Sequence, residues 1–383
     1  MTLTCGQPDT PFGRVRHPDA MTNDTIRPRF RPGVAVLQRR AGELQIGLDP
    51  RRAVVVRDLP APVAAAAARL TGGRTTAELL AGVGPPHREI LADLLANLLG
   101  RGLVEDASGP GSPVPRRLAA DTTVSAQRPS TAHPAERAGL GVYIHGSGRL
   151  AVAIACQLAA AGVGHVHVNA RGRVAAEDVG AGLRPEDVGR ARQPAAHDAV
   201  RRADDTVVTR RFSRARPHLA LLTDALVPEP AVTAELVERG IPHLRVSARD
   251  GVGIVGPLVV PGVSSCLRCA DHHRAHIDPC WPTVAGQLAG RSQLVDLSTV
   301  HTTAGVAAAQ TLHALGWLRD PRVPTPSTWN TALEVDAFAA ELDRRPWAPH
   351  PDCACGAAAH PSYRYLFPAR SRRRRAVARG GRG

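Results

Sequence analysis

The sequence predicts an α/β protein with a doubly wound, Rossmann-like domain, preceded by a small winged-helix domain of α+β type. A strand, a glycine turn, a helix and a second strand follow one another within residues 141–169, which is the pattern of a βαβ unit. Residues 28–105 begin with strand-like alternation and continue with helical periodicity. A stretch rich in Ser, Pro and Thr separates the two regions, as a linker would.

Length and composition set the domain boundaries. With 383 residues, the chain is too long for one ordinary core. We expect a disordered N-terminus over 1–27, the winged-helix domain over 28–105, a flexible linker over 106–137, the Rossmann-like domain over 138–368 and a basic disordered tail over 369–383.

The formal net charge of +14 is compatible with nucleic-acid binding. A coding bias that replaces lysine with arginine is the better explanation, because all 48 basic residues are arginine. Many of these arginines lie in the tail. A run of arginines at the end of a chain is usually a solvated segment, so we expect no nucleic-acid partner. No window is apolar enough for a membrane helix, and residues 1–31 lack a signal-peptide pattern. We therefore expect a cytoplasmic protein without membrane contact.

The first domain opens with strands. Alternating apolar residues over 34–48 flank the turn at Ala41-Gly42, which predicts a β-hairpin. A short strand follows over 53–56, and an alanine-rich helix over 62–70.

Two further helices and a strand complete this domain. Thr75 and Glu78 have capping-box spacing and begin a short helix. The next helix runs over 86–100 with one broad leucine-rich face, and residues 103–104 predict a returning wing strand. The order of these elements is that of a winged helix.

The second domain continues the α/β alternation beyond its βαβ unit. We expect strands over 142–144, 166–169, 218–223 and 243–247, helices over 150–161, 230–239 and 302–318, and a weaker strand over 206–210. This alternation argues for a doubly wound sheet.

The turn Gly146-Ser147-Gly148 would let backbone amides at a helix N-terminus approach a phosphate. Arg149 follows, and Ala151 takes the place of a third glycine. The alternative is a tight strand-to-helix turn without a ligand.

Two cysteine pairs form the strongest motif. Cys266 and Cys269 make one pair, and Cys353 and Cys355 make the other. Four thiolates suit tetrahedral Zn²⁺ and leave no open position, so we expect a structural zinc site. A redox dithiol is the alternative for the first pair. The alternative metal ligands nearby are His272, His273, His276 and His350.

Together these motifs resemble the nucleotide-binding domain of the ThiF, MoeB and ubiquitin-activating superfamily. Residues 141–169 are similar to its nucleotide-binding start, and 219–224 to a later strand whose final aspartate lies near ATP phosphates and magnesium. Residues 256–262 resemble the approach to its first zinc knuckle. The resemblance covers 139–358 and implies ATP with Mg²⁺ as ligand, Asp224 as a catalytic residue and a homodimer.

The nucleotide residues depart from the family's pattern. Arg149 replaces a glycine, while Asn169 and Arg171 replace two aspartates. Arg192 stands at the position of the catalytic lysine, and Arg184 is a candidate for the family's arginine. In the family, the first of the two replaced aspartates holds ribose. Adenylation needs Mg²⁺ and cations that stabilise charge on the transferring phosphate, so losing a carboxylate while gaining arginines implies weakened or lost adenylation. The implied cofactor-binding residues are Gly146, Gly148, Arg149, Asn169 and Arg184.

A winged helix fused to such a domain resembles the leader-peptide recognition domain of thiazole- and oxazole-peptide (RiPP) pathways. This resemblance implies a precursor peptide bound as an added strand near 34–37, and a partner cyclodehydratase. The first hypothesis is therefore a leader-peptide-binding scaffold protein with a degenerate ATP site. The alternative is an active ATP-dependent adenylyltransferase acting on a peptide or sulfur-carrier C-terminus. A DNA-binding regulator is a third hypothesis, which the few basic residues of the helix over 86–100 disfavour.

Overall fold

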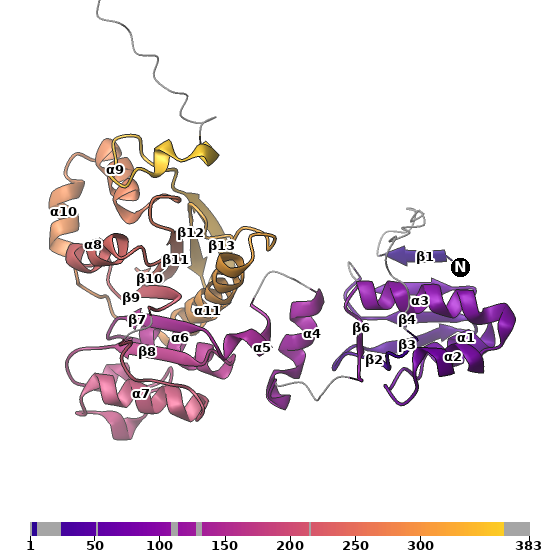
Figure 1. Cartoon of the computed structure of the whole chain (residues 1–383). Helices are drawn as coiled ribbons and strands as arrows, with labels where there is room; N and C mark the ends of the chain where they lie inside the picture. Colours follow the sequence, from indigo (N-terminus) through magenta and orange to yellow (C-terminus); the bar gives the residue numbers. More distant parts are fainter. Residues whose placement is uncertain are drawn as a thin grey trace, which may run out of the picture. The chain divides into compact units, whose positions relative to one another are not determined.

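The computed structural model of the chain describes residues 2–5, 24–50, 53–108, 114–127, 132–213 and 216–363. Two compact units make up the chain (Figure 1). Unit 1 comprises Met1–Ala138 with Asp320–Pro324, and unit 2 comprises Gly139–Arg319 with Thr325–Gly383. Among the described residues, no helix is long and apolar enough to cross a membrane. The expected basic tail lies outside the described residues.

Unit 1 combines an antiparallel sheet, in the order β1-β5-β4-β3, with helices packed against it. Four leucines of one helix face, at positions 91, 94, 95 and 98, are at most 1% exposed and join the sheet's apolar side chains in one core. The elements are β1 (Thr2–Cys5), β2 (Pro28–Phe30), β3 (Val36–Arg40), β4 (Glu43–Ile46), β5 (Val54–Arg57), α1 (Ala61–Ala67), α2 (Thr76–Gly82), α3 (Arg88–Gly100), β6 (Val104–Asp106), α4 (Ala119–Gln127) and α5 (Pro134–Arg137).

The local predictions for the hairpin and the capped helix are confirmed. β3 and β4 pair around Gly42, whose φ of +70° favours glycine and whose added Cβ would lie 2.9 Å from the Leu59 carbonyl oxygen. Thr75 Oγ1 accepts a hydrogen bond from the Glu78 amide at 3.2 Å, and Glu78 Oε2 accepts one from the Thr75 amide at 2.7 Å. Both elements therefore follow from residues that lie close together in the sequence.

The expected flexible linker contains helices instead. Within 106–137, α4 and α5 form, and the Arg137 guanidinium donates to Asp121 at 2.8 Å. Thr123 Oγ1 donates to the Pro32 carbonyl oxygen at 2.6 Å. Hydrogen bonds of this kind leave no apolar periodicity in the sequence.

Two strands of unit 1 pair in unexpected ways. β6, expected as a wing, pairs with β2 in a separate two-stranded sheet. β1 forms inside the expected disordered N-terminus and pairs with β5, while residues 6–23 lie outside the described residues. Both pairings join segments far apart in the sequence, which local pattern does not encode.

Unit 2 is built on a mixed sheet with strand order β13-β12-β11-β10-β9-β7-β8. The four strands from β8 to β10 in this order are parallel, and the strands beyond them pair antiparallel. Its elements are β7 (Gly141–His145), α6 (Arg149–Ala160), β8 (His165–Asn169), α7 (Arg192–Ala203), β9 (Leu219–Thr223), α8 (Pro230–Glu238), β10 (His243–Arg249), β11 (Val252–Val259), α9 (Leu267–Ile277), α10 (Trp281–Leu288), α11 (Leu297–Arg319), β12 (Thr331–Asp336) and β13 (Glu341–Pro346).

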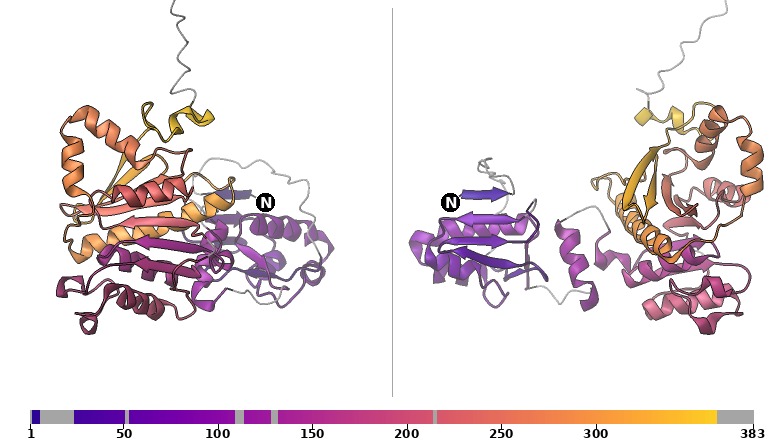
Figure 2. Two further views of the ribbon diagram at one scale, coloured as in Figure 1. Left: turned by 60° about the vertical axis from the view of Figure 1, so that its left-hand side comes forward. Right: turned by 180° about the vertical axis from the view of Figure 1, so that it is seen from behind.

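The helices cover the two faces of this sheet unequally. α6 packs against both α7 and α11 on one face, and α8 lies on the other (Figures 1 and 2). Val142 and Ile144 are fully buried, whereas Tyr143, between them, is only partly buried. Tyr143 is less buried than its neighbours because α8 leaves this side of β7 and β8 partly open.

Candidate functional sites

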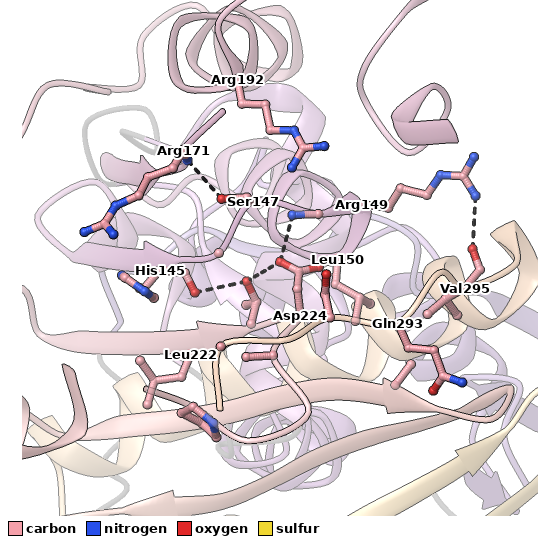
Figure 3. A pocket seen from close by; sticks show the side chains of 18 of the residues that line it. His145, Ser147, Arg149, Leu150, Arg171, Arg192, Leu222, Asp224, Gln293 and Val295 are labelled. Atoms are coloured by element: carbon pink, nitrogen blue, oxygen red, sulfur yellow. Dashed lines mark hydrogen bonds between the residues drawn. The ribbon is translucent and has the colours of Figure 1, made fainter. Parts of the chain in front are cut away.

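A cavity of about 350 Å³ lies at the carboxyl ends of the parallel strands, where doubly wound proteins bind ligands. The glycine turn Gly146–Gly148 lines it, together with Asp224 after β9 and the first residues of α6. Figure 3 shows these groups around the cavity. The sheet topology brings the turn and Asp224 together although they are far apart in the sequence.

Asp224 faces the N-terminus of α6. Its Oδ2 accepts hydrogen bonds from the Gly148 amide at 3.0 Å and from Thr223 Oγ1 at 2.9 Å. Burial raises the pKa of the Asp224 carboxyl, and the hydrogen bonds from Gly148, Thr223, Leu150 and Ala151 oppose this rise. The Asp224 side chain thus accepts hydrogen bonds from amides at the N-terminus of α6, where an anion is favoured.

The same contact explains both glycines of the turn. A Cβ at position 146 would lie 1.8 Å from Thr223 Oγ1, and one at position 148 would lie 2.4 Å from Asp224 Oδ1. Neither glycine has a positive φ, so close approach rather than backbone conformation requires glycine here. The nearest group is therefore the Thr223 hydroxyl at position 146 and the Asp224 carboxyl at position 148.

Two of the three arginines that line the cavity have side-chain partners within the chain. The Arg149 guanidinium donates to the Val295 carbonyl oxygen at 3.0 Å, and Arg192 pairs with Asp178 at 2.6 Å. Each keeps one buried donor, Nε, without a hydrogen-bond partner in the described structure. Arg171 is exposed, and its backbone amide donates to Ser147 Oγ at 2.9 Å.

Asn169 ends β8 and belongs to a polar group on the open side of the sheet. Its Nδ2 donates to the Tyr143 hydroxyl at 2.8 Å and lies 3.3 Å from His145 Nδ1. Burial lowers the pKa of His145, which favours its neutral ring. A second cavity of about 700 Å³ lies beside the first and shares His145, Asn169 and Arg171 with it.

The structure brings most of the expected nucleotide residues into the first cavity, but not Arg184. Gly146, Gly148, Arg149, Asn169, Arg192 and Asp224 all line it. Arg184 is exposed and lies outside its lining, and its backbone amide donates to Asp187 at 3.0 Å. The segment 290–295, which forms one wall, was missed because it carries no motif. The open sheet side could have been read from the apolar–polar alternation of 141–145 and 165–169.

The two cysteine pairs meet at one point in unit 2. The ligand atoms of Cys266, Cys269, Cys353 and Cys355 lie within 4.8 Å of one another. The Sγ–Sγ distance is 3.8 Å between Cys266 and Cys269, 3.6 Å between Cys266 and Cys353, and 3.5 Å between Cys269 and Cys355. A tetrahedron with metal–sulfur bonds of about 2.3 Å has edges of about 3.8 Å, so the four cysteines fit a metal ion.

The surroundings of the cysteines fit a closed metal site. Gly262 and Gly356 have φ of +74° and +73°, the conformations that favour glycine in tight turns. His272 and His350 stack on one another at 4.9 Å between ring centroids, and His273 Nε2 lies 2.9 Å from the Ala348 carbonyl oxygen. The four thiols therefore make a complete set of metal ligands, and a histidine ligand is not needed.

Comparison with solved structures finds the same fold in MccB and in PaaA. E. coli MccB with ATP matches with a TM-score of 0.64 and 13% identity, and MccB with MccA matches with 0.63 and 13%. Both alignments cover 86% of this chain and 99% of MccB. PaaA matches with 0.61 and 17% identity, covering 82% of this chain and 98% of PaaA.

One further MccB structure describes the protein as a microcin C7 biosynthetic enzyme, in complex with N-formylated MccA. No family model and no curated protein sequence matches the chain. A coverage of 86% exceeds what unit 2 alone contains, so the similarity extends into unit 1. Structural similarity at this identity shows the fold, which this chain shares with MccB and PaaA.

Proposed function

We propose that this protein binds a precursor peptide and presents it to a partner enzyme, a cyclodehydratase, in the biosynthesis of a modified peptide. In this proposal, unit 1 is the winged-helix-type peptide-recognition domain and unit 2 is a scaffold whose ATP site is degenerate. MccB, which has this fold over nearly its whole length, has been solved with MccA. That likeness supports a peptide as the ligand.

The observation that favours a scaffold is that charged side chains of the first cavity already have hydrogen-bond partners within the chain. Asp224 is bound to amides of the α6 N-terminus, Arg192 to Asp178 and Arg149 to a backbone carbonyl. Asn169, at the position that resembles a ribose-binding aspartate, is tied to Tyr143. A nucleotide would have to break several of these contacts, each of which contributes about 1 kcal/mol or more.

The second candidate is an active adenylyltransferase. Two observations favour it: the similarity to MccB with ATP, and the unpartnered Nε donors of Arg149 and Arg192 in the cavity lining. In that case Arg192 would stabilise negative charge on the transferring phosphate, and Asp224 would hold Mg²⁺.

Calorimetric titration of ATP with Mg²⁺ into the metal-loaded protein, together with a pyrophosphate-exchange assay, separates the two. The scaffold proposal expects no saturable binding at millimolar ATP and no exchange. Saturable binding that Arg192→Gln weakens and the matched Arg184→Gln leaves unchanged would support the adenylyltransferase instead. Arg184 is the control because it is exposed outside the cavity.

The metal in the proposal is a structural Zn²⁺. The four clustered cysteines, Cys266, Cys269, Cys353 and Cys355, would hold it and join the segments around residues 266–269 and 353–355, and all four would serve as metal ligands. A homodimer, implied by the resemblance alone, remains a prediction that sedimentation analysis can test.

A further inference from the structure

The sheet of unit 1 carries a strand from the chain's own N-terminus. β1 pairs antiparallel with β5 along the whole of that strand, with Thr2 opposite Arg57 and Cys5 opposite Val54. In the right-hand view of Figure 2, β1 lies at one edge of the sheet. On its other side β5 pairs with β4. Without β1, β5 would therefore be the edge strand.

An edge strand offers unpaired amide and carbonyl groups, which readily accept another extended segment. β5 is well suited to this, because Val54 and Val56 are at most 2% exposed and anchor it in the core of unit 1. The hairpin edge near 34–37, expected from sequence to take the peptide, lies on the opposite side of the sheet at β3. The structure thus identifies β5 as the edge that accepts a strand.

We propose that residues 2–5 act as a built-in competitor, which occupies the peptide-binding edge of unit 1 until an external peptide displaces it. This inference rests on the proposed peptide-binding function. β1 has only four residues, so its own pairing is weak. Tethering raises its effective concentration to about the millimolar range, which lets a weak strand hold the edge against weak ligands.

The register also indicates which peptides compete. Residues directly opposite in an antiparallel pair lie on the same face of the sheet. Peptide positions opposite Val54 and Val56 therefore face the core, and the position between them lies on the face of Val55. The displacing ligand is an extended segment with apolar residues at alternate positions, added antiparallel to β5.

The test uses the full chain and a labelled synthetic peptide of residues 1–8 as the probe. The double variant Leu3→Pro/Thr4→Pro removes two successive backbone donors from β1. The matched control Leu3→Val/Thr4→Val keeps those donors and strand propensity. We expect the proline variant to bind the probe about tenfold or more tightly than wild type, and the valine control to bind like wild type. Equal affinity for wild type and proline variant, or no saturable binding to the proline variant, overturns the proposal.

Hydrogen exchange supplies an independent readout. Amides of residues 54–57 that face β1 should be protected in wild type and in the valine control, and should exchange faster in the proline variant. Unchanged exchange overturns the proposal even if probe binding differs.

A precursor peptide separates this inference from the proposed function. If the proline variant binds the probe but neither protein binds a precursor peptide encoded nearby, only the proposed function fails. If a precursor peptide binds wild type and proline variant equally, only the self-competition fails.

Discussion

The Asp224 carboxylate accepts a hydrogen bond from the Gly148 amide at 3.0 Å, across 76 residues of sequence. This contact joins the end of β9 to the start of α6, the two elements between which a doubly wound fold binds its ligand. The Asp224 side chain therefore satisfies a backbone donor at the N-terminus of α6, where anions are favoured.

Replacing Asp224 tests the structural role of that carboxylate. Asp224→Ala should lower the free energy of unfolding by about 1–3 kcal/mol, because buried amides lose their acceptor. Asp224→Asn keeps an acceptor and tolerates the φ of +67° at this position, so it should cost less than about 1 kcal/mol. Urea unfolding of the three proteins measures the difference, and equal stability of the two variants would contradict this role.

The glycine turn gives a second, steric prediction. Gly148→Ala places a Cβ 2.4 Å from Asp224 Oδ1, so it should destabilise the protein by about 1–3 kcal/mol. Gly305→Ala is the matched control, since it lies inside α11 with nothing within 4 Å of its added Cβ. The control should be neutral or stabilising by up to about 1 kcal/mol. Thermal melting compares the two, and a neutral Gly148→Ala would show that the turn can relax.

The cysteine cluster predicts one bound metal ion per chain. Purified protein should contain about one equivalent of zinc by elemental analysis. Cys266→Ser should release the metal and lower the melting temperature, because binding of the ion contributes to folding. Cys280→Ser should retain both, since Cys280 is exposed and lies outside the cluster. Wild-type protein with far less than one equivalent would refute the site.

Burial of His243 predicts a loss of stability in acid. Its side chain is 1% exposed, and burial lowers its pKa from 6.5 to about 4. The unfolded chain binds a proton below pH about 6.5 while the folded one does not, so stability falls as the pH drops toward 4. This group should account for about 2 kcal/mol of stability lost between pH 7 and pH 5.

The non-titrating variant His243→Gln isolates that contribution. Its amide can still donate to the Ile241 carbonyl oxygen, which lies 3.0 Å from His243 Nδ1. Urea unfolding at pH 7 and pH 5 should show a smaller acid loss in the variant than in wild type. An identical loss in both proteins would assign the acid sensitivity to other groups.

Several predictions made from the sequence rest on short-range pattern, and the structure confirms them. The Thr75 and Glu78 capping box, the hairpin around Gly42 and the βαβ unit over 141–169 each depend on residues close in the chain. The stretch 106–137, expected to be a flexible linker, contains α4 and α5 and polar contacts such as Arg137 to Asp121. Such contacts leave no periodic signal.

The sequence by itself determined the α/β class, the glycine turn and the two cysteine pairs, because each depends on residues that lie close together in the chain. Only the tertiary structure decided that Cys266 lies 3.6 Å from Cys353, that Asp224 meets Gly148, and that β1 joins β5. These contacts depend on strand order and on packing of the whole unit. Residues far apart in the chain meet only after the folded core has fixed both of their elements in place.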